Sequence, residues 1–236
     1  MSCKYPTEPT ARAKAHPMPG SAMCGAQFKP NLKTCMRIAF LALLFVAAPA
    51  LAQAPPLQEG AITCSSPIAP NDSGKSLRQR YGKDAVVQEL PGAEGQTYKG
   101  LVLLPRAADR RIEVSFAGDT MKRATGFTIR DKAKASRWNL SGITIGSGLA
   151  EVQKVNGKPF LVSGFDWDYG GFVADWKGGA LGRMEGGCRV MMRFGKQTGA
   201  PRNLSGDGVK ASSDNVALVK WAPVVTEIGI GFASGR

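Results

Sequence analysis

The stretch GLAEVQKVNGKPFLVSGFDWDYGGFVADW, residues 148–176, decides the fold class. Its first part has apolar residues such as Leu149 and Val152 at helical spacing, which predicts a short helix. Gly157 ends this helix, and Pro159 prevents its continuation, because proline has no backbone donor and clashes with the preceding turn. Aromatic residues, acids and glycines follow and lead into a strand. A short helix followed directly by strands is typical of an α+β protein.

Alternating apolar and polar residues predict half-buried antiparallel strands elsewhere in the chain. In 111–116, Ile112, Val114 and Phe116 share one face, and 188–194 has the same pattern. Further strands are expected at 84–90, 97–104, 124–129 and 171–176, with one or two closing strands within 216–232. A second helix is expected at 75–81, capped by residue 71, 72 or 73. We therefore expect an α+β fold, predominantly antiparallel β-sheet with short helices.

Local matches within the chain indicate an internal repeat. They recur in the same order in both halves and pair 81–83 with 156–158, 97–102 with 168–173, and 111–116 with 189–194. On this basis we predict two similar tandem α+β units, 62–138 and 139–236. The alternative is that any antiparallel α+β chain shows such likeness between its parts.

The N-terminal region has the pattern of a secretory signal. Residues 1–35 are polar and rich in proline, and we expect Met36 as an alternative start. Residues 36–52 combine a short basic region, an apolar run and an Ala50-Leu51-Ala52 cleavage site. Cleavage near Ala52 would leave a Pro-rich lead-in, 53–61, on a periplasmic or secreted protein. The alternative is an uncleaved membrane anchor.

Cleavage would change the chemistry that is available to the protein. The full chain has 31 Lys and Arg residues and 18 Asp and Glu residues; the mature part keeps 25 and 17, a net charge of +8. The only histidine, His16, would be removed. A mature chain without histidine excludes Ser-His-Asp and Cys-His catalysis and the usual zinc sites.

Cleavage would also leave two cysteines, Cys64 and Cys188. Because the expected compartment is oxidising, we predict one disulfide between them. The alternative is two buried free thiols.

Two resemblances to known families are carried by the central stretch. The segments GITIG (142–146), LAEV (149–152) and NGKP (156–159) resemble the opening of small outer-membrane assembly lipoproteins of the SmpA/OmlA type. Their fold, helices against a small antiparallel sheet, is similar to each half of the secreted β-lactamase-inhibitor protein. The pattern LAEV…NGKPF…GF-WDYGG with a downstream cysteine also resembles a secreted bacterial family of unknown function. These resemblances imply tandem α+β units but supply no activity.

The candidate binding residues are five consecutive ones, Phe165, Asp166, Trp167, Asp168 and Tyr169. Aromatic side chains beside mixed charge are typical of binding hot spots. The same run has the D-x-D-x-G spacing of a calcium loop, but a glycine stands at its fifth position and a lysine at its twelfth, where calcium loops need oxygen ligands. We therefore expect no metal and no cofactor. The plain alternative is a structural turn with buried aromatic residues.

Paired carboxylates favour a second hypothesis, a carboxylate-based glycan hydrolase. Asp166 and Asp168 would form the pair, with Glu185 or Asp175 nearby. A third hypothesis follows from clusters of Lys and Arg at 75–83, 106–111 and 122–137, which suit anionic envelope lipid or lipopolysaccharide. Nucleic acid is not expected in this compartment. The leading interpretation is a non-catalytic periplasmic binding protein, inhibitor-like or an envelope-assembly module, with a protein partner in the cell envelope.

Overall fold

Antiparallel strand pairing dominates the structure, a computed structural model that describes residues 60–130 and 136–233. The helices are α1 (Gly74–Tyr81), α2 (Leu149–Asn156) and α3 (Val216–Trp221). The strands are β1 (Ala85–Pro91), β2 (Thr97–Leu103), β3 (Ile112–Phe116), β4 (Ala124–Arg130), β5 (Leu161–Ser163), β6 (Val173–Asp175), β7 (Arg189–Gly195), β8 (Lys210–Ser212) and β9 (Val224–Gly231). Short 3-10 turns occupy Gly82–Asp84, Ala180–Gly182 and Arg202–Leu204. These elements confirm the predicted α+β class.

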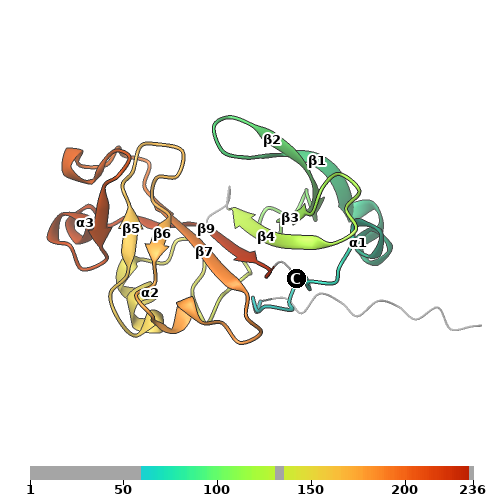
Figure 1. Ribbon diagram of the computed structural model, residues 1–236, viewed down its shortest axis with the longest axis horizontal. Coiled ribbons are helices and arrows are strands. Elements are labelled where there is room, and N and C mark those ends of the chain that lie inside the picture. Colours follow the sequence, from blue (N-terminus) through green and yellow to red (C-terminus); the bar gives the residue numbers. More distant parts are fainter. Residues whose placement is uncertain (1–59, 131–135, 234–236) are drawn as a thin grey trace, which may run out of the picture. The chain divides into compact units, whose positions relative to one another are not determined.

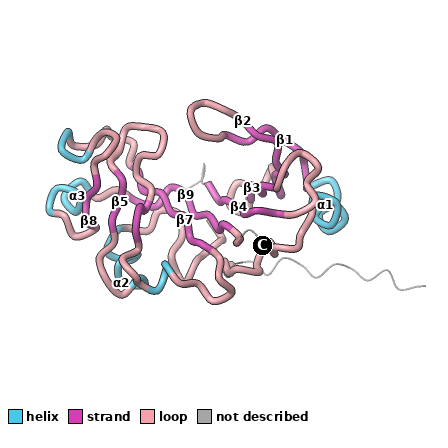
Figure 2. The backbone as a smooth tube through the Cα atoms, in the orientation of Figure 1, coloured by secondary structure: helices cyan, strands magenta, loops and turns pink. Residues whose placement is uncertain are grey.

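The described strands form two sheets. The larger has the order β1-β2-β3-β4-β9-β7, so that β9, the last strand in the sequence, lies between β4 and β7 (Figure 1). The smaller has the order β6-β5-β8. Loops rather than regular elements make up much of the chain around β5 and β8 (Figure 2). The aromatic cluster that the sequence singles out lies in one of these loops, between β5 and β6.

The hydrophobic core lies against one face of the larger sheet. Val190, Met192 and Phe194 of β7 are buried there, and so are Ile112 and Val114 of β3, as their alternation predicts. The residues between them point to the other face. Two acids on that second face, Glu113 of β3 and Glu227 of β9, are also buried. The alternation at 111–116 puts Glu113 on the polar face of its strand and does not indicate that it is buried.

Both predicted helices form where expected. Ser73 is the N-cap of α1, because its hydroxyl accepts from the Ser76 amide at 3.1 Å. Gly157 is the C-cap of α2 and adopts φ 79°, a left-handed conformation that glycine favours.

The prediction for the C-terminal region is partly wrong. Residues 216–221 form the helix α3 instead of part of a strand, and only 224–231 form the closing strand β9. The valines of this segment favour a strand, but Asn215 overrides them as an N-cap whose side chain accepts from the amides of Ala217 and Leu218. The three-residue strands β5 and β8 were not predicted, because so short a run shows no periodicity.

The structure does not confirm two tandem units. β4, from the expected first unit, pairs along its length with β9 from the second, so one sheet crosses the expected boundary at 138/139. The duplication therefore stays a prediction.

Two parts of the chain that carry predictions lie outside the described residues. They are residues 1–59, which include the predicted extension and signal peptide, and residues 131–135, which belong to the basic cluster at 122–137. Within the described ranges, no helix has the length and apolar character that a membrane crossing requires.

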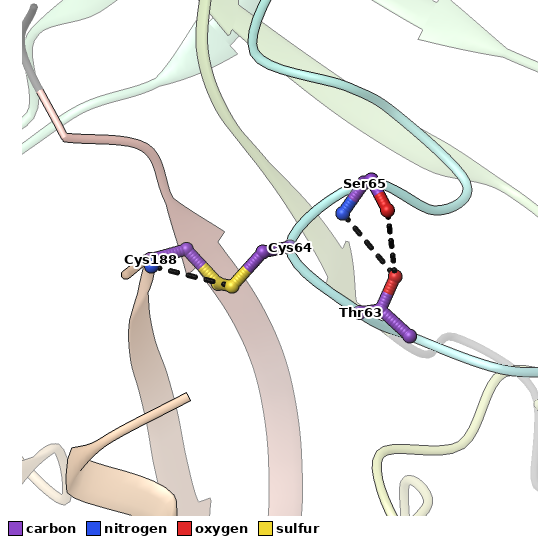
Figure 3. The surroundings of a disulfide bond; sticks show 4 residues. All are labelled: Thr63, Cys64, Ser65 and Cys188. Atoms are coloured by element: carbon purple, nitrogen blue, oxygen red, sulfur yellow. Dashed lines mark hydrogen bonds between the residues drawn. A yellow bond between two sulfur atoms is a disulfide. The ribbon is translucent and has the colours of Figure 1, made fainter. Parts of the chain in front are cut away.

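The predicted disulfide between Cys64 and Cys188 is confirmed (Figure 3). It joins the segment before α1 to the start of β7, 124 positions apart in the sequence. The backbone amide of Cys188 also donates to the Cys64 sulfur at 3.2 Å. Both cysteines are buried against the core, so the crosslink ties the N-terminal segment to the larger sheet.

Loss of this crosslink should lower the free energy of unfolding by about 4–5 kcal/mol, the chain-entropy value for a closed loop of this length. Urea unfolding of the protein, with and without reductant, measures the change. A Cys64→Ala/Cys188→Ala variant is the control, because its unfolding midpoint should not respond to reductant. An unchanged midpoint for the reduced wild type would contradict the prediction.

Candidate functional site

The aromatic loop, residues 164–172, has a backbone that few sequences allow. Asp166 adopts φ 62° and Gly171 adopts φ 78°, both in the left-handed region. Asp tolerates this region better than most residues with a side chain, and glycine enters it freely. Two such positions in one loop reverse the chain sharply between β5 and β6. The aspartate at position 166 and the glycine at position 171 are therefore explained by backbone geometry.

Hydrogen bonds within the aromatic loop fix the orientation of its largest side chain. The Trp167 indole donates from Nε1 to the Gly164 carbonyl at 2.8 Å, and the Gly170 amide donates to the Trp167 carbonyl at 2.8 Å. The Trp167 and Tyr169 rings make an edge-on contact with centroids 5.4 Å apart. Tyr169 remains 47% exposed. The loop thus presents an aromatic pair whose position is set before any ligand arrives.

Strand β7 holds one side of the aromatic loop in place. Arg193 donates from Nε to the Gly170 carbonyl at 2.7 Å, and its guanidinium lies 5.1 Å from the centroid of the Phe172 ring. The Phe194 amide donates to the Gly171 carbonyl at 2.8 Å. A Cβ at Gly171 would lie 2.1 Å from the Phe194 carbonyl oxygen. Only glycine therefore permits this close approach between the loop and β7.

The other side of the aromatic loop is held by the segment after β7. The Ser205 hydroxyl donates to Asp166 Oδ2 at 2.8 Å, and the Gly206 amide donates to the Phe165 carbonyl at 2.8 Å. The Phe165 ring meets the Trp221 ring edge-on, with centroids 4.6 Å apart. Trp221 Nε1 is buried and has no hydrogen-bond partner in the described part of the chain.

The aromatic loop forms one wall of an open groove of about 1310 Å³. The lining also comes from the β1–β2 turn, the end of β7, the start of β9, Trp221 and residues 145–146. Its apolar members outside the aromatic loop include Pro91, Ala93, Ile145, Met191 and Val224. The groove brings together segments that are more than 130 positions apart in the sequence. It is therefore a product of the fold, not of any one motif.

Paired charges form part of the groove lining. Arg130 donates from Nε to Glu227 Oε2 at 2.8 Å and from Nη2 to Glu227 Oε1 at 3.3 Å. Its third nitrogen, Nη1, donates to Glu113 Oε2 at 2.6 Å. Arg111 bonds the other oxygen of Glu113. Both buried carboxylates are thereby compensated, as buried charges must be.

Burial is the largest single influence on the pKa of Arg130, and it acts to lower that pKa. The hydrogen bond to Glu227, the charge of Glu227 and the charge of Glu113 together outweigh burial, so that the pKa of Arg130 is raised. Burial also raises the pKa of the nearby Tyr98 hydroxyl, against the opposing charge of Arg130. Arg130 therefore stays charged at physiological pH.

All five predicted binding residues line the groove. Within the aromatic loop Phe165 is buried, Trp167 is half-buried, and Asp166, Asp168 and Tyr169 are exposed. Glu185 and Asp175 are not part of the lining, and Asp175 instead forms an ion pair with Lys177 at 3.7 Å. The fold therefore does not gather the four carboxylates considered for hydrolysis. No group of three or more His, Cys, Asp or Glu side chains placed to hold a metal ion occurs in the described residues.

Sequence reasoning missed the charged residues that the strands contribute to the groove. Arg130, Arg193 and Glu227 lie on β4, β7 and β9, and none of them was a candidate site residue. One signal was available: Glu227 is the only charged residue of the apolar strand VVTEIGIG. A lone acid in such a run requires a partner. The identity of that partner follows from strand order, which the sequence does not give.

No family model matches the chain, and no curated protein or solved structure matches it significantly. The two family resemblances therefore stay predictions.

Gly171→Ala should destabilise the protein by more than Gly178→Ala. Both residues have a positive φ, which costs about 1–2 kcal/mol for an alanine. Only Gly171 also has a backbone atom in the way, which adds about 1–3 kcal/mol; a Cβ at Gly178 meets no described atom within 4 Å. Urea unfolding of the two variants measures the difference. Equal losses would contradict the tight contact between the loop and β7.

Arg130→Met should lower the free energy of unfolding by about 3 kcal/mol, because it leaves the buried Glu227 carboxylate without a cation. Adding Glu227→Gln to that variant should recover part of the loss. Arg78→Met, an exposed position on α1, is the control and should change stability by less than about 0.5 kcal/mol. If the double variant is less stable than Arg130→Met alone, the pairing described above is wrong.

Proposed function

We propose that the chain is a secreted, non-catalytic binding protein that holds part of a partner protein in the groove. The observation that carries this proposal is the aromatic loop, whose Trp167 and Tyr169 are fixed in place in the open groove by contacts with β7 and Ser205. Fixing these side chains before binding lowers the entropy lost on association. The disulfide fits the expected oxidising compartment, the periplasm or the exterior.

The size and composition of the groove support a protein partner. Pockets for small molecules usually enclose roughly 300–1,000 Å³, whereas this groove encloses about 1310 Å³. Its lining combines tryptophan, tyrosine and phenylalanine with Met191 and two arginines. Aromatic residues, methionine and arginine are the types enriched in protein interfaces. A segment of polypeptide fits such a lining better than a small metabolite.

The carboxylates of the groove support binding rather than hydrolysis. Glu227 is committed to Arg130 through both oxygens. Asp166 accepts from Ser205 and sits on a strained backbone. A retaining or inverting hydrolase needs two carboxyl groups free to exchange protons or attack across one bond. Of the carboxylates that line this groove, only Asp168 has neither a hydrogen bond nor an ion pair among the described residues.

Site-specific photo-crosslinking tests the proposed function. A benzophenone amino acid replaces Tyr169 in one variant and Val216 in another, and both are exposed to native envelope extract. Val216 is the matched control, because it is 82% exposed and lies outside the groove. We expect one defined protein product from position 169 and not from position 216.

Adding Trp167→Ala to the Tyr169 crosslinking variant should remove that product, because truncation of a hot-spot tryptophan weakens binding by about 30-fold or more. Identical products from positions 169 and 216, or a product that persists without Trp167, would overturn the proposal.

A further inference from the structure

One carboxylate lies between two arginines in the wall of the groove. In the larger sheet, Glu227 of β9 is directly opposite Arg130 of β4 on one side and opposite Arg193 of β7 on the other. Both Glu227 oxygens accept from Arg130. The register therefore brings Arg193 next to a carboxylate whose two oxygens already accept hydrogen bonds from Arg130.

Arg193 consequently keeps unused hydrogen-bonding capacity. Its Nε donates to the Gly170 carbonyl, and its guanidinium packs near the Phe172 ring. Neither of its Nη atoms has a hydrogen-bond or ion-pair partner among the residues that the structure describes. Since Nε and the ring fix the plane of the guanidinium, the two Nη atoms form an ordered pair of donors. Such a pair matches a carboxylate, which accepts two parallel hydrogen bonds.

Apolar side chains surround this pair of donors. Met191, on the same strand and the same face as Arg193, is 37% exposed, and Val224 is 38% exposed. Together with the aromatic loop, these side chains make the groove lining mostly apolar, with a few charged residues among them. A sugar chain would leave aliphatic side chains such as these without apolar contacts, and an anionic lipid surface would require more cations. An amphipathic peptide satisfies both parts of the lining.

We infer that the groove binds a peptide segment that places a carboxylate on the Nη atoms of Arg193 and an apolar side chain against Trp167 and Tyr169. This inference rests on the proposed function and specifies its ligand. The carboxylate belongs either to an Asp or Glu side chain or to the free C-terminus of the partner. Both sources offer the same pair of acceptor oxygens.

Peptide display on the mature protein identifies the ligand and the source of its carboxylate. Random 12-residue peptides are displayed in two formats, one with a free C-terminus and one with the peptide inside a longer chain. We expect enrichment of peptides with an apolar residue at a fixed spacing from a carboxylate. Enrichment in both formats assigns a side-chain carboxylate, and enrichment in the free format alone assigns a C-terminus.

Synthetic versions of the enriched peptides then test the role of Arg193. Replacing the peptide carboxylate by an amide should weaken binding to the wild type by about 10- to 100-fold. Arg193→Gln should bind the acid and amide peptides equally. Arg189→Gln is the matched control on the same strand and face; Arg189 is not part of the groove lining, and its variant should keep the full difference.

The Arg193→Lys variant tests whether the effect of Arg193→Gln comes from the lost donor pair or from misfolding of the loop. It keeps the positive charge without the planar donor pair, so it should retain a reduced preference for the acid peptide. If wild type binds acid and amide peptides equally, the inference fails while the proposed function stands. If no peptide is enriched, and peptidoglycan fragments or phosphatidylglycerol vesicles bind instead, both fail.

Discussion

The register of β9 between β4 and β7 is the constraint on which the groove depends. It sets Glu227 opposite Arg130 and Arg193 at the same level of the sheet. Arg130 also bonds the buried Glu113, so the two buried acids share this cation, and Arg111 bonds the other oxygen of Glu113. With Glu227 committed to Arg130, the Arg193 guanidinium is available to the aromatic loop. One strand position thus determines both a stabilising network and the chemistry of the groove.

The aromatic loop is built from contacts that lie on both sides of it. β7 supports it through Arg193 and Phe194, and Ser205 holds it through Asp166. Its ring pair would otherwise be free to turn into the protein or into solvent, with a loss of side-chain entropy on binding. The groove is therefore ready for a ligand without rearrangement of the loop. This order is the physical basis for treating the loop as a binding surface.

The sequence predicts local features of this protein well and long-range ones poorly. Alternation at 188–194 predicts which side of β7 is buried, and the N-cap of α1, Ser73, is one of the three neighbouring residues that the sequence offered. The five candidate binding residues at 165–169 all line the groove, but the sequence did not predict the groove itself. The sequence could not predict that Arg130, Arg193 and Glu227 lie side by side, because the strand order β4-β9-β7 makes them neighbours. Non-local pairing of this kind leaves no mark at any fixed sequence spacing.

The aromatic loop is already ordered on β7 in the ligand-free protein, and its readiness for a ligand depends on this order. Native-state hydrogen exchange measures this directly at the amides of Gly170 and Phe194, which donate to the carbonyls of Trp167 and Gly171. We expect protection of both amides close to that of the β7–β9 ladder. Rapid exchange at Gly170 and Phe194, with the ladder still protected, would contradict it.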